Sequence, residues 1–216
     1  MQSGLCSSER GTSLAIDVSP AGALRRRVEL QDRLWRAAHS TLDLTGNHAS
    51  GKHLHRAIQS YLLKASDQKI VVEAPVAIHK TLLFVGPDRD GYSDIAVGTV
   101  RNFNRKKELP HFTRRDGGWF DFQLQVKEED SRVEIIAYDF ELRLPSGSGF
   151  DFVRFDLNPP GHDNQADGLR SHLHLNADDD GLAAPAPVMS PFEILDLFLH
   201  GLRRNGRVRS SAVNGV

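Results

Sequence analysis

The stretch VEIIAYDFELRL, from Val133 to Leu144, alternates apolar and polar residues. Its apolar positions are Ile136, Tyr138, Phe140, Leu142 and Leu144. The positions between them are Asp139, Glu141 and Arg143. Because successive side chains of a β-strand point to opposite faces, this period of two predicts a strand with one apolar and one polar face.

The same alternation appears on both sides of this stretch, in 119–126, 152–157 and 169–176. Four such segments predict an antiparallel sheet that is covered on one face only, with 145–149 as a hairpin loop. Three further segments are also expected to form strands: Lys69–Ile78, Thr81–Val85 and Ser93–Phe103.

Helical periodicity appears before and after the sheet. Residues 21–66 contain two apolar stripes separated by a turn, which predicts a helical hairpin whose second helix is capped by Ser50. Ser190-Pro191-Phe192-Glu193 has the pattern of a capping box with proline at the first helical position. We therefore expect a helix over 190–202 that covers the apolar face of the sheet.

The fold class that follows is α+β, with a single domain over 21–202. Its parts are a helical hairpin (21–66), an antiparallel sheet (69–176) and a closing C-terminal helix (190–202). The Ser/Gly-rich residues 1–20 predict a flexible tail, and 203–216 a basic tail.

Composition narrows the protein class. The chain has 216 residues, 39% of them hydrophobic and 25% charged, and 27 Lys and Arg balance 28 Asp and Glu. These values are typical of a soluble globular protein and exclude a globally basic nucleic-acid binder, although a local basic patch stays open. The single cysteine, Cys6, excludes an internal disulfide framework and a cysteine-based zinc site. Without a signal pattern or a long apolar run, we expect a cytoplasmic protein.

The main candidate for chemistry is His172-Leu173-His174, because residues two apart on a strand project from the same face. Arg154 and Asp156 share a face of their own strand in the same way. If the two strands are neighbours, the polar face collects six candidates: Arg143, Arg154, Asp156, His172, His174 and Asn176. His162, in the connection between these strands, is expected to reach the same edge.

These residue types support three uses. Two histidines with Asp156 or His162 can hold a divalent metal that keeps an open position for water. Without a metal, one histidine can take the proton of a ribose 2′-hydroxyl while the other protonates the leaving oxygen, with Arg154 stabilising the charge on phosphorus. Binding of an anion without chemistry is the third use. A merely solvated polar sheet face is the alternative to all three.

A second candidate is the basic segment 101–115, in which phenylalanines lie among the cations. Cations contact phosphates and aromatic rings stack on unpaired bases, so the segment is typical of an RNA or single-strand groove. The substrate-binding candidates here are Arg105, Lys106, Lys107 and Arg114, beside Arg143 and Asn176 on the sheet face. A charged loop that protects a sheet edge is the alternative.

Several motifs together resemble the TumE family, small toxins of bacterial toxin–antitoxin pairs. They are Tyr138–Arg143, Phe152–Asp156 with Asn158-Pro159, His162, Ser171–His174 and the final Ser-Pro-x-Glu helix. The resemblance covers residues 118–200. It implies a toxic activity such as RNA cleavage, and an antitoxin as the partner.

The function expected from the sequence is that of a toxin-like or antiviral-defence protein acting on RNA, a nuclease and hydrolase. His172, His174, Arg154 and Asp156 are its catalytic candidates. A divalent metal, if one is present, is expected on His172, His174 and His162. The alternative is a non-catalytic binding module or subunit that docks a protein partner or nucleic acid, and no membrane contact is expected.

Overall fold

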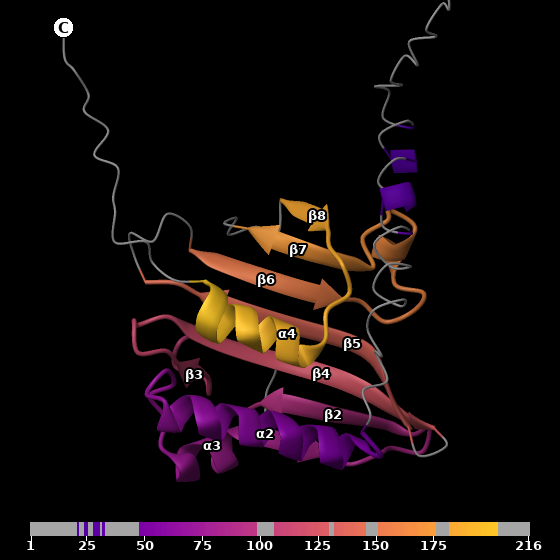
Figure 1. Cartoon of the computed structure of the whole chain (residues 1–216). Coiled ribbons are helices and arrows are strands. Elements are labelled where there is room, and N and C mark those ends of the chain that lie inside the picture. Colours follow the sequence, from indigo (N-terminus) through magenta and orange to yellow (C-terminus); the bar gives the residue numbers. More distant parts are fainter. Residues whose placement is uncertain are drawn as a thin grey trace, which may run out of the picture.

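The computed structural model is an open antiparallel sheet with helices packed on it (Figure 1). It describes residues 48–98, 106–129, 132–145, 151–175 and 182–202, with isolated positions between 21 and 32. The helical elements are α2 (Gly51–Asp67), α3 (Pro75–Thr81), the 3-10 turn η1 (Asp163–Gln165), α4 (Pro191–Asp196) and its π-helical continuation η2 (Leu197–Gly201). The strands are β1 (Leu82–Val85), β2 (Tyr92–Val97), β3 (Phe112–Thr113), β4 (Trp119–Glu129), β5 (Arg132–Arg143), β6 (Phe152–Leu157), β7 (Ser171–Leu175) and β8 (Ala183–Pro185).

The sheet runs in the order β1-β2-β4-β5-β6-β7-β8, with β3 also paired to β4. The long β4 and β5 strands form its centre, and Phe122 lies opposite Phe140 across them. Their rings stack with centroids 4.6 Å apart and planes inclined by 10°. The mixed α+β class and the antiparallel sheet expected from the alternation are therefore present.

Helices cover the apolar face of this sheet. Leu54, Ile58 and Leu62 of α2 belong to the same buried core as the apolar residues of β4 and β5. At the other helix, Phe198 of η2 packs on Phe120 and Phe155, with ring centroids 6.1 and 6.2 Å apart. Figure 1 shows α4 lying in front of the central strands. The polar residues that alternate with the core residues of these strands are therefore on the opposite face.

Both helices begin where their capping residues stand. The Ser50 side chain accepts a hydrogen bond from the His53 backbone, and Ser190 forms the expected capping box with Glu193. Each cap satisfies backbone donors that the first helical turn leaves unpaired.

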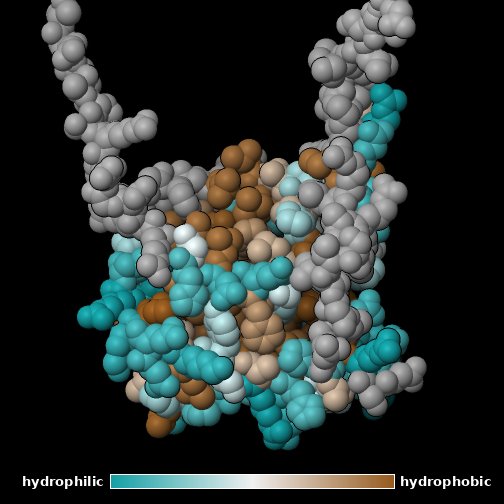
Figure 2. Space-filling model, viewed as in Figure 1, coloured by the Kyte–Doolittle hydropathy of each residue, from teal (hydrophilic) through white to brown (hydrophobic). Residues whose placement is uncertain are grey.

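Figure 2 shows the molecule from the same side as Figure 1. Much of this surface is hydrophilic, and hydrophobic side chains are exposed over β7 and β8.

The strand predicted over Lys69–Ile78 is wrong. Its β-branched residues suggested a strand, but Val71 makes only an isolated bridge to Arg114, and α3 begins at Pro75. Proline is favoured in the first helical turn, where its missing N–H is not needed. The structure also adds β8, an edge strand that accommodates Pro185 and that the sequence did not predict.

Ile136, one of the predicted core positions of Val133–Leu144, is buried (7% exposed) but does not belong to the main core cluster. A register shift between Gln125 and Val126 pairs Val126 with Ile135, so Ile135 joins the core cluster and Ile136 does not. A bulge adds one residue to one strand, which reverses the face parity on its far side.

Several predicted segments lie outside the described residues. They are the tails 1–20 and 203–216, most of the first predicted helix, and most of the 145–149 loop. The strand predicted over Ser93–Phe103 is described only to Val97, and Gly98 follows with a positive φ of 78°. No helix in the described ranges is long and apolar enough to cross a membrane.

Candidate functional site

The polar faces of β5, β6 and β7 lie side by side, because the three strands are consecutive in the sheet. The register places Asp156 opposite His172 and Arg154 opposite His174. On the other side of β6, Arg154 lies opposite Glu141. The strands that carry Arg154 and His172 are therefore neighbours, as the composite site requires. Their register also places each histidine directly across from a residue of the predicted site on β6.

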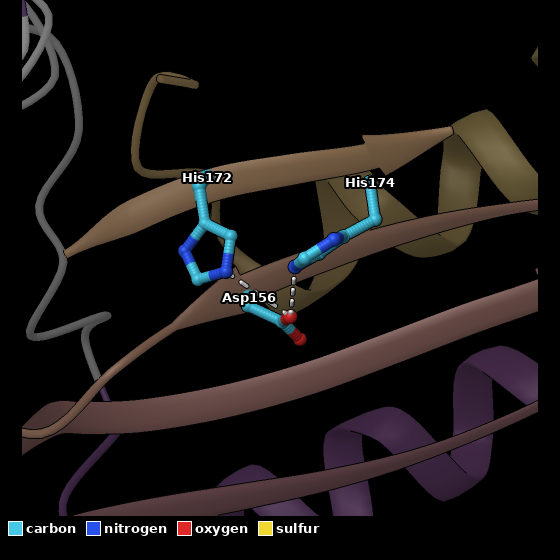
Figure 3. A group of neighbouring side chains, drawn as sticks. All are labelled: Asp156, His172 and His174. Carbon is cyan, nitrogen blue, oxygen red and sulfur yellow. Dashed lines mark ion pairs between the residues drawn. The ribbon is translucent and has the colours of Figure 1, made fainter. Parts of the chain in front are cut away.

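Asp156 is the centre of this group, which we call the Asp–His cluster (Asp156, His172 and His174; Figure 3). Its Oδ2 atom lies 3.4 Å from Nε2 of His172 and 3.2 Å from Nε2 of His174. The two imidazole rings have centroids 4.7 Å apart and planes inclined by 68°. Figure 3 shows both rings reaching down from β7 toward the one carboxylate on β6.

The cluster is not a solvated face. His172 is 3% exposed and His174 6%, whereas Leu175 at the end of the same strand is 38% exposed. Further polar side chains of this face are also buried: Asp121, Asp139 and Glu141. Burying charged and polar groups is unfavourable unless they are paired, so the face requires an internal network.

Arginines supply part of that network. The Arg154 Nε–H donates to Asp156 Oδ2 at 2.9 Å, and its Nη1 lies 3.7 Å from Glu141 Oε2. Glu141 Oε1 accepts a hydrogen bond of 2.6 Å from Nε of Arg143. The Arg143 guanidinium also lies over the Phe152 ring, 4.7 Å from its centroid. These contacts hold the Asp156 carboxylate and connect it across β6 to β5.

Burial changes the acidity of one histidine. The pKa of His172 is lowered from its ordinary value, chiefly because burial disfavours the charged imidazolium; the Asp156 carboxylate opposes this effect and His174 adds to it. The neutral imidazole is the form that accepts a proton or ligates a metal. The Nδ1 atoms of His172 and His174 are both buried.

One ring nitrogen from each histidine and one oxygen of Asp156 lie within 4.8 Å of one another. His162, the third predicted metal ligand, is not in this group. It is exposed in the connection before β7. His162 is the N-cap of η1, and its Nδ1 accepts a hydrogen bond from the Asn164 backbone. Of the two residues considered as the third ligand, Asp156 and His162, it is Asp156 that lies with the two histidines.

Arg114, predicted to bind substrate, instead has a structural position. Its side chain is 4% exposed, and its guanidinium donates to the carbonyls of Phe198 and Leu202 and pairs with Asp116. These partners accept four hydrogen bonds from the guanidinium, and the side chain is almost fully buried. Its burial beneath η2 favours a structural role for Arg114 over the predicted contact with substrate.

Arg143 belongs to the network described above, and the other four substrate-binding candidates divide into two groups. Lys106 and Lys107 are exposed in a turn closed by a hydrogen bond from the Leu109 backbone to the Lys106 carbonyl. Arg105 and Asn176 lie outside the described residues.

Sequence reasoning missed Glu141 as part of the site. The signal was available, because Glu141 lies on the polar face of β5 together with Arg143, but a cross-strand contact to Arg154 depends on register.

Comparison of the chain with protein-family models, with curated proteins and with solved structures finds no match.

Proposed function

We propose that this protein is a toxin-like ribonuclease whose catalytic centre is the Asp–His cluster on the polar sheet face. The observation that carries the proposal is the convergence of two buried imidazoles on one carboxylate, with an arginine donating to the same oxygen. Perturbed, buried titratable groups on adjacent strands are typical of catalytic sites.

The residues around the cluster match the charge of a phosphodiester. Arg154 contacts the cluster, and Arg143 is connected to it through Glu141. A guanidinium stabilises negative charge that develops on phosphoryl oxygens. The side-chain exposed fraction rises from 4% at His172 to 15% at Arg154 and 27% at Arg143. The substrate phosphate would therefore approach from the β5 side and meet the arginines first.

The proposal assigns the rest of the nucleic acid to exposed cations. Lys106 and Lys107 lie in an exposed turn, and phosphate contacts of this kind position a strand without reading its sequence. The proposal includes an antitoxin as protein partner, in line with the resemblance to the TumE family.

The test is cleavage of labelled cellular RNA by the purified chain. We expect the wild type to cleave, the His172→Ala/His174→Ala double variant to lose activity, and His162→Ala to retain it. His162→Ala is the matched control, since it removes an imidazole from the same connection but outside the cluster. Absence of cleavage by the wild type with any divalent metal added would overturn the ribonuclease proposal and leave a binding module.

A further inference from the structure

The arrangement of the two histidines separates the two chemistries that the residues allow. An acid–base pair acting in line on a phosphodiester must reach the attacking and the leaving oxygen on opposite sides of phosphorus. With hydrogen bonds of about 3 Å at each end, the two nitrogens would stand roughly 7 Å apart. Here one nitrogen of each ring lies within 4.8 Å of a nitrogen of the other, and both Nε2 atoms approach the same oxygen. The pair therefore does not straddle a phosphorus atom.

Two of the three distances between the candidate ligand atoms fit a coordination sphere. In a tetrahedral zinc site with bonds of about 2.0–2.1 Å, neighbouring ligand atoms lie roughly 3.3 Å apart. The contacts from Asp156 Oδ2 to the two Nε2 atoms are 3.4 and 3.2 Å. Two imidazoles and one carboxylate are also a donor set that divalent transition metals accept.

We propose that Asp156, His172 and His174 bind one divalent transition-metal ion of the zinc type, each residue supplying one ligand atom. The inference rests on the site of the proposed function and deepens it by naming the cofactor.

The surroundings of the cluster support this assignment. The hydrogen bond from Arg154 Nε fixes the Asp156 carboxylate, as partners of metal-ligating carboxylates usually do. The ligands stand on two hydrogen-bonded strands, opposite each other in register, so their backbone positions are set by the sheet before any ion binds. The low exposure of both histidines limits competition from water.

Three protein ligands leave a fourth position for water, whose pKa a bound zinc ion lowers to about 7. In the hydrolysis this allows, the water oxygen bonds to phosphorus and the bond from phosphorus to the leaving nucleoside oxygen breaks. The leaving oxygen takes up a proton released by the water. One water is consumed, and no oxidant or reductant is needed.

The experiment measures metal binding directly, without RNA. The full chain is stripped with EDTA, dialysed and titrated with Zn²⁺ by calorimetry and with Co²⁺ by visible absorption. We expect one ion per chain in the wild type and in His162→Ala. In Asp156→Asn and His174→Gln we expect affinity to fall by about 100-fold or more, since even partners outside the ligand set change affinity by 10–100-fold.

Asp156→Asn keeps the side-chain size, and far-UV circular dichroism shows whether each variant is folded. X-ray absorption of the zinc-loaded wild type provides a readout that needs no variant, and we expect two imidazole ligands. Absence of stoichiometric binding by the wild type, or equal affinity in folded Asp156→Asn and His162→Ala, would overturn the metal site.

Parallel RNA cleavage assays keep the two proposals distinguishable. A chain that binds the ion through these residues but does not cleave RNA supports the metal site and overturns the ribonuclease. A chain that cleaves RNA equally well after metal removal and binds no ion supports the ribonuclease and overturns the metal site.

Discussion

Replacing Arg114 by methionine tests whether this arginine is structural or binds substrate. Its guanidinium donates to the Phe198 carbonyl at 2.6 Å and to the Leu202 carbonyl at 2.7 Å, at the end of η2. These are carbonyls that a helix end leaves without an intrahelical partner. Methionine matches the length of the arginine stem but donates no hydrogen bond, so both carbonyls lose their partner.

The expected cost follows from the burial of each hydrogen bond. A hydrogen bond from a charged donor contributes about 1.5–3 kcal/mol, and the one to Phe198 is fully buried, so we assign it about 2 kcal/mol. The hydrogen bond to Leu202 is only partly buried and contributes about 1 kcal/mol. The Asp116 side chain is 37% exposed, so solvent screening leaves its ion pair with little net value. Arg114→Met should therefore lower the free energy of unfolding by about 3 kcal/mol.

The assay is urea unfolding followed by circular dichroism, with Lys107→Met as the matched control. Lys107 is exposed, and its replacement removes the same charge outside the core, so a change within about 0.5 kcal/mol is expected. A loss below about 1 kcal/mol for Arg114→Met, at an unchanged denaturant slope, would refute the assigned structural role. So would a large loss of RNA affinity in Arg114→Met under conditions where that variant is fully folded.

Three further outcomes are expected. Charge reversal of Lys106 and Lys107 to glutamate should weaken RNA binding. The slope of log affinity against log salt should fall by about 0.7 for each phosphate that the variant no longer neutralises. An unchanged slope in a filter-binding titration would exclude these lysines from the RNA interface. If a metal-bound water is the nucleophile, a substrate with 2′-deoxy at the scissile position should be cleaved at a comparable rate, and complete resistance on a gel would instead indicate attack by the 2′-hydroxyl. Gly98→Ala should destabilise the fold by about 1–3 kcal/mol in the urea assay, because Gly98 has φ of +78° and an added Cβ would lie 3.0 Å from the Pro110 ring; wild-type stability would show that this turn relaxes freely.

The alternation in VEIIAYDFELRL and its neighbours was sufficient to predict the central strands and the shared face of His172 and His174. That parity is a local property, because each strand residue alternates faces whatever the strand pairs with. The capping box at Ser190 was readable for the same reason, since its partners lie within one helical turn.

Local pattern failed wherever a distant partner decided the outcome. Ile136 lies outside the core cluster because of a register shift against β4, and Arg114 is buried because carbonyls 84 and 88 residues later need donors. His162 is close to the pair along the chain, yet the third member of the cluster is Asp156, which the pairing of β6 with β7 brings opposite His172.

The residue types of the site could therefore be predicted from the sequence, because two histidines, an aspartate and an arginine each lie on the polar face of a predicted strand. Their convergence and burial were decided by the tertiary structure. Strand pairing, register and the elements that cover the sheet depend on the connections between strands and on packing over the whole core. Those contributions have no local signature, so the sequence supplied the donor atoms and the folded sheet set the 3.2 and 3.4 Å that make them a candidate centre.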